Sequence, residues 1–127
     1  MAGNTTPIFS RIGVISGSTI GSVQTFSSGS YTVGSNIFPV FIADATNGAY
    51  VQRVRFAPIS TTAATATTAT VLRVYVSSVS TSGSAATAAN TWLFQEVAAA
   101  AQTPATTTAV AYIEVPLNFA LPPGYAI

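Results

Sequence analysis

The 127-residue chain contains no cysteine, histidine or lysine, and its only formal charges are four arginines and three acids. Without cysteine there is no disulfide framework and no thiolate metal site. Without histidine or lysine, a serine or threonine hydroxyl has no side-chain base to activate it. Asp44 offers a single carboxylate to a cation, which makes a poor calcium or magnesium site. We therefore expect a protein that is not an enzyme, with no catalytic residue, cofactor or metal.

Basic charge and long apolar runs are also scarce. A net charge of +1 provides no basic stripe for nucleic acid. The mean hydropathy of +0.51 comes largely from alanine, and no segment reaches the roughly 18 apolar residues of a spanning helix. Residues Met1–Pro7 lack the basic and apolar regions of a secretory signal. We expect synthesis in the cytoplasm, and no nucleic-acid or membrane partner.

The length favours a single domain. We predict a flexible N-terminal arm over residues 1–10 and one β-sandwich domain over residues 11–127.

Alternation of apolar and polar residues, the period of a half-buried strand, is the strongest pattern in the chain. Aromatic and β-branched residues dominate these segments, as in antiparallel sheets. Short strands separated by turn residues predict an all-β fold, an antiparallel β-sandwich or barrel. The four strong segments are Tyr50–Ile59, Val71–Ser77, Thr91–Val97 and Val110–Leu117, and weaker ones are Ile12–Ile15, Val23–Phe26 and Tyr31–Val33.

A fifth strand is predicted at Ile37–Ala43, paired in a hairpin with the strand that starts at Tyr50. The connection contains Asn47-Gly48, a pair that readily adopts positive φ. Pro39 cannot donate to a sheet ladder, so this strand is expected at a sheet edge or a bulge.

Three stretches of small residues separate the strands: 60–70, 80–90 and 98–108. The first two are interpreted as long loops or exposed edge strands. The third contains four consecutive alanines, which could form one helical turn before Pro104 ends it. The sequence leaves that turn open.

Four side chains are candidates for contact with another protein: Arg53, Arg55, Arg73 and Tyr75. Arg53 and Arg55 share one face of a strand, and Arg73 and Tyr75 share the polar face of the next strong strand. One interpretation is a patch that binds carboxylates of a partner. The favoured alternative is cross-strand pairing of the arginines with Glu96 or Glu114.

Two further groups allow a functional and an ordinary interpretation. Glu96 and Glu114 could form a pair of catalytic carboxylates, but an arginine-paired strand face explains them better. Trp92 and the five tyrosines could stack on a carbohydrate, whereas ordinary packing explains aromatic residues more often. We expect Trp92 to lie in the core.

The surface implied by this composition is unusual, because only 6% of the residues are charged against about a quarter in an average soluble domain. Short side chains such as Ala, Ser and Thr lose little rotamer entropy when a neighbour covers them. Such a surface suits repeated, tight contacts between subunits.

Five segments carry a resemblance to a known group of proteins: Gly48–Pro58 with the Thr/Ala tract after it, Val71–Val76, Trp92–Glu96, Ile113–Leu117 and Leu121–Tyr125. In style and strand order they resemble the capsid cement, or decoration, proteins of tailed bacteriophages, which have a jelly-roll-like fold. The likeness spans about residues 37–127.

The resemblance implies a virion protein on the outer capsid surface that stabilises contacts between capsomers. Its partners would be the major capsid protein and itself, as a homodimer or homotrimer. The alternative is a tail- or fibre-associated phage protein that binds a host glycan.

Overall fold

The computed structural model describes residues 14–20, 31–59, 65–105 and 107–127. The arm predicted for residues 1–10 and the weak strand at Val23–Phe26 lie outside these ranges. Val14 and Ile15 belong to no strand.

The described chain is all-β, and every strand pair is antiparallel. The fold class predicted from alternation is therefore confirmed at this level. No described residue belongs to a helix, so none of the described segments is a helix that could cross a membrane. The strands are β1 (Tyr31–Thr32), β2 (Ala49–Phe56), β3 (Thr70–Ser77), β4 (Ala85–Ala86), β5 (Thr91–Ala99) and β6 (Ile113–Leu121).

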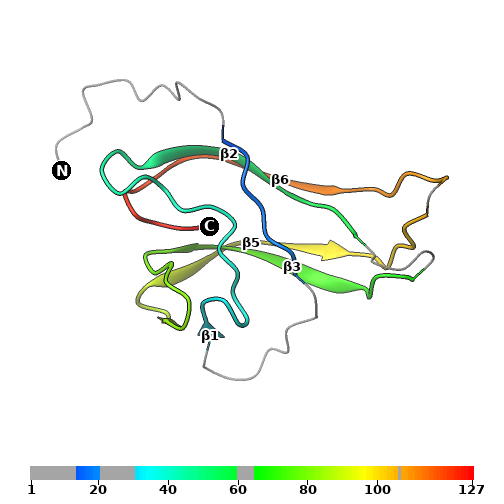
Figure 1. Cartoon of the computed structure of the whole chain (residues 1–127), viewed down its shortest axis with the longest axis horizontal. Helices are drawn as coiled ribbons and strands as arrows, with labels where there is room; N and C mark the ends of the chain where they lie inside the picture. Colours follow the sequence, from blue (N-terminus) through cyan, green and yellow to red (C-terminus); the bar gives the residue numbers. More distant parts are fainter. Residues whose placement is uncertain (1–13, 21–30, 60–64, 106) are drawn as a thin grey trace.

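Two long two-stranded sheets, β2–β6 and β3–β5, form two layers (Figure 1). β6 contributes most to the space between them, because Val115, Leu117 and Leu121 are almost fully buried. Val74 of β3 belongs to the same apolar cluster, so the layers share one core. The buried members of that cluster are Ala43, Val74, Val115, Leu117, Leu121 and Ile127.

Each long sheet contains one irregularity in its register. In β2–β6 the pairing shifts between Val51 and Arg53, and the extra residue lies on β6, where Asn118 has a φ of +51°. Asn tolerates this left-handed conformation better than most residues. Regular alternation would place Val51 and Arg53 on one face, but at this shift Val51 packs against the core while Arg53 is exposed.

The alanine-rich stretch after Val97 does not form the helical turn that the sequence left open. Ala98 and Ala99 are the last residues of β5 and pair with Val71 and Thr70. Pairing with β3 thus decides the conformation where local propensity favours a helix. Farther along the chain, the side-chain amide of Gln102 forms hydrogen bonds with the backbone N–H and carbonyl of Ala111. The backbone N–H of Gln102 donates to the hydroxyl oxygen of Thr67. One glutamine thereby joins two of the small-residue loops.

The predicted hairpin between Ile37–Ala43 and the Tyr50 strand is wrong. β2 pairs with β6, and Ile37–Ala43 makes only isolated bridges. The turn itself is confirmed: the Gly48 N–H donates to the Asp44 carbonyl at 3.0 Å, and Gly48 has a φ of +71°. The Asn47-Gly48 pair therefore predicts the turn, but it does not determine which strand pairs with β2.

Residues Tyr125–Ile127 take the place that the hairpin was expected to fill. Val40 N–H donates to the Ile127 carbonyl at 2.7 Å, and Ile127 N–H donates to the Phe41 carbonyl at 3.0 Å. On the other side, Ala126 and Ser77 exchange backbone hydrogen bonds of 2.8 and 2.9 Å. Tyr125–Ile127 therefore joins β3 to the segment at residues 40–43.

Candidate protein-contact surface

The outer face of the β2–β6 sheet holds two of the candidate contact residues, Arg53 and Arg55. Both donate to one carboxylate on the facing strand: Arg53 Nη1 lies 3.2 Å from Glu114 Oε1, and Arg55 Nη2 lies 3.1 Å from Glu114 Oε2. The Arg55 guanidinium also stacks 4.1 Å from the centroid of the Tyr112 ring. We call these four side chains the arginine cluster.

The cluster has one more positive than negative charge, and it lies in solvent. Hydrogen bonds from Arg55, and then the charge of Arg53, lower the pKa of Glu114 below its ordinary value. Both arginine side chains are about half exposed, at 54% and 49%, so the ion pairs are weak contributors to stability. Cross-strand pairing, the favoured interpretation of these arginines, is confirmed.

The other two candidates lie on the β3–β5 sheet. Arg73 Nε donates to Glu96 Oε1 at 2.6 Å across the sheet. Tyr75 packs against Tyr31 of β1, with ring centroids 6.5 Å apart. Partial burial, and then the neighbouring Tyr31, raise the pKa of Tyr75 above its ordinary value.

The four candidates therefore form two groups, one on each long sheet, rather than a single patch. Glu96 and Glu114 are likewise separated: each is bonded to an arginine on its own sheet. An arginine-paired strand face, the favoured interpretation of the two glutamates, is therefore present at both. Within the described residues, no three His, Cys, Asp or Glu side chains gather as a metal site would require.

The expectation that Trp92 lies in the core is wrong. Its side chain is 46% exposed and stacks on Tyr125, with centroids 6.3 Å apart and planes 9° apart. The adjacent Leu93 and Phe94 are exposed to a similar extent, at 48% and 45%. Phe94 contacts Phe119 of the other sheet at 5.1 Å between centroids. We call Trp92, Leu93 and Phe94 the β5 triplet.

The sequence contained the signal for this exposure. Consecutive residues of a strand point to opposite faces, so three adjacent large apolar residues cannot all enter one core. The register shift between Val74 and Tyr75 places the extra residue of β5 at Phe94.

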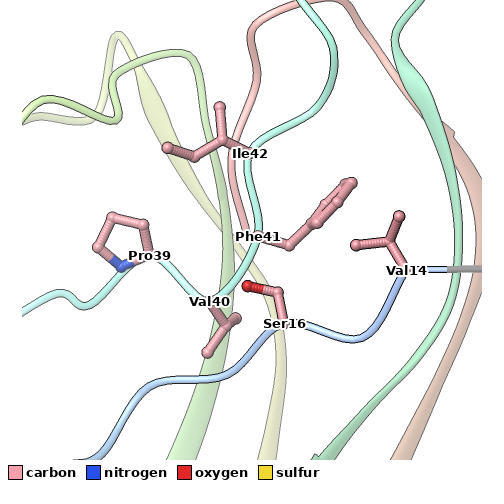
Figure 2. A pocket seen from close by; sticks show the side chains of 6 residues that line it. All are labelled: Val14, Ser16, Pro39, Val40, Phe41 and Ile42. Carbon is pink, nitrogen blue, oxygen red and sulfur yellow. The ribbon is translucent and has the colours of Figure 1, made fainter.

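A shallow, open pocket of about 320 Å³ lies where residues 14–16 cross residues 39–42 (Figure 2). Its wall offers one hydroxyl and no charged group, whereas small-molecule sites usually place several polar groups to orient the ligand. The pocket is lined by Val14, Ser16, Pro39, Val40, Phe41 and Ile42.

Comparisons with protein-family models, curated proteins and solved structures gave no match to this chain.

Proposed function

We propose that this chain is a virion structural protein, a capsid cement or decoration protein that binds the outer surface of an icosahedral phage shell and stabilises contacts between capsomers. Its partners are the major capsid protein and further copies of itself, as a homodimer or homotrimer. In this proposal the two facing sheets belong to a jelly-roll-like sandwich. The shell contacts involve Arg53, Arg55, Arg73 and Tyr75.

The balance of exposed and buried apolar side chains carries the proposal. Among the described residues, eleven large hydrophobic side chains are exposed, against six that are buried. Large exposed apolar areas on a soluble protein indicate surfaces that other molecules cover. The exposed set is Val14, Ile15, Ile20, Ile42, Tyr50, Ile59, Val71, Trp92, Leu93, Phe94 and Tyr112.

The pairing of charges supports the same function. Arg53, Arg55 and Arg73 each have a carboxylate partner within the chain. A surface whose charges are already paired can approach a neighbour without leaving an isolated charge away from water. Its remaining short side chains order at little entropic cost.

The copy number of the polypeptide in intact particles tests the proposal. Quantitative mass spectrometry should give a ratio to the major shell protein near that of the shell subunits themselves. Particles that lack the polypeptide should then lose resistance to heat and osmotic shock. A chain absent from purified particles, or particles equally resistant without it, would refute the cementing function.

A second function, recognition of a host glycan by a tail- or fibre-associated protein, is favoured by one observation. Trp92 and Tyr125 present nearly parallel rings, and the Trp92 ring is half exposed. A few copies per particle, together with a sugar-dependent change in tryptophan fluorescence that Trp92→Phe removes, would support this function. No fluorescence change across a glycan panel would exclude glycan stacking on Trp92.

A further inference from the structure

The β5 triplet exposes side chains on both faces of one strand. Trp92, Leu93 and Phe94 are each 45–48% exposed, although Trp92 stacks on Tyr125 and Phe94 contacts Phe119. A molecule that packed on one face of the sheet would cover only part of the triplet. A strand added along the free edge of β5 would cover all three side chains, because its own side chains flank both faces.

The edge of β5 is free within the described part of the chain. Leu93–Ala99 has no backbone hydrogen bond to any described segment except β3. The unpaired N–H and C=O groups of such an edge can form a ladder with another strand.

The other three long strands protect their edges better. β2 carries two charged residues, Arg53 and Arg55. β6 carries Glu114, Pro116 and the bulge at Asn118, all features that hinder strand addition. β3 bonds Ala126 through Ser77. β5 has no proline, only the register shift at Phe94, and a single charge, Glu96, that Arg73 already pairs.

We propose that the edge of β5 pairs antiparallel with β5 of a second copy, which joins two β3–β5 sheets into one four-stranded sheet about a twofold axis. The strand reads TWLFQEVAA, with its bulky residues in the first half and its small residues in the second. Antiparallel pairing about a centre near Gln95 places the bulky half of each copy beside the small half of the other. Parallel pairing would set bulk against bulk and Glu96 beside its own copy, which like charge disfavours.

This dimer specifies how copies of the chain would associate in the proposed function. It rests on that function only for its location on a capsid shell. The contact itself requires the purified chain alone. A dimer formed by a chain that is absent from virions would leave this inference intact and refute the proposed function.

The oligomeric state of the purified chain, measured by sedimentation equilibrium, is the first test. We expect a dimer. Leu93→Lys should raise its dissociation constant by at least about 10-fold, because a charge replaces an apolar side chain that the dimer would bury. The matched control is Ile59→Lys, which adds the same charge at a residue 61% exposed outside the strands and should leave the constant unchanged. A wild-type chain that stays monomeric at high concentration, or equal effects of the two variants, would overturn the proposal.

Cross-linking is the second test, and it does not depend on the folding of a charged variant. Because the chain has no cysteine, Gln95→Cys introduces one thiol near the proposed twofold axis, where paired Cα atoms come within disulfide range. Mild oxidation should give a covalent dimer. The control Ala120→Cys, exposed on β6, should give none, and equal cross-linking at both positions would contradict a specific β5 contact.

Discussion

The two long sheets are built alike but differ in how deeply their side chains are buried. Each is an antiparallel pair with one register shift and an arginine–glutamate contact across the strands. In β2–β6, β6 buries Val115, Leu117 and Leu121 and shows its polar residues to solvent. In β3–β5, no residue of β5 is fully buried. One sheet therefore anchors the fold, and the other retains exposed apolar side chains.

Replacement of the same residue in the two sheets should give the largest contrast. Leu121→Ala on β6 removes a side chain that is 2% exposed, and we expect a loss of about 2–5 kcal/mol in the free energy of unfolding. Leu93→Ala on β5 removes one that is 48% exposed, and we expect a loss near 0.5 kcal/mol. Urea unfolding of dilute protein measures both, and similar losses would contradict the difference between the sheets.

Two glycines test how tightly the start of β2 packs on the end of β6. A methyl group at Gly48 would lie 2.5 Å from the Leu121 carbonyl oxygen, whereas the space beside Gly83 is open. Both glycines have positive φ, so both alanine variants carry a backbone cost of about 1–2 kcal/mol. Thermal unfolding should show a larger loss for Gly48→Ala. An equal loss would mean that the Leu121 carbonyl moves aside freely.

The register shift of β2–β6 depends on Asn118, the only non-glycine residue with positive φ in the described chain. Asn118→Val should destabilise the protein by about 1–2 kcal/mol, because a β-branched side chain disfavours the left-handed conformation. Asn118→Gly should be within about 0.5 kcal/mol of the parent. Ala120→Val, on the same exposed face of β6, is the control, and a loss as large as that of Asn118→Val would assign the cost to bulk rather than conformation.

The smallest effect concerns the arginine cluster and its dependence on pH. The folded state lowers the pKa of Glu114, so its pairing stabilises the fold above the ordinary glutamate pKa and is lost as the pH falls through the lowered folded value. Asp44 titrates in the same acidic range, because the backbone N–H groups of Asn47 and Thr46 lower its pKa. The difference between wild type and Glu114→Gln isolates the glutamate. A difference that persists unchanged to low pH would exclude the ion pairs as its cause.

The alternation of apolar and polar residues was enough to predict the long strands of this fold. Alternation located β2, β3, β5 and β6. The predicted cross-strand pairing of the arginines with Glu96 or Glu114 is also present. The predicted strand at Val110–Leu117 started too early and stopped too soon, since β6 passes through the left-handed Asn118 to Leu121.

The parts that could not be predicted depend on contacts between distant segments. Whether β2 pairs with residue 40 or with β6 is decided by partners far along the chain, and the Asn47-Gly48 turn is compatible with both. The four alanines after Val97 favour a helix locally, yet β3 holds the first two in a strand. The stacking of Trp92 on Tyr125 likewise joins residues that are far apart in the chain.

The position of Tyr125–Ile127 between Ser77 and residues 40–43 also determines when folding can finish. The core requires both Ala43 and Ile127, so loop closure over most of the chain precedes the contacts that stabilise it. Such long-range topology slows folding. The strands that precede residues 125–127 cannot complete this core until those residues have been synthesised. We therefore expect slow folding, with apolar strands exposed to chaperones and to aggregation in the interval.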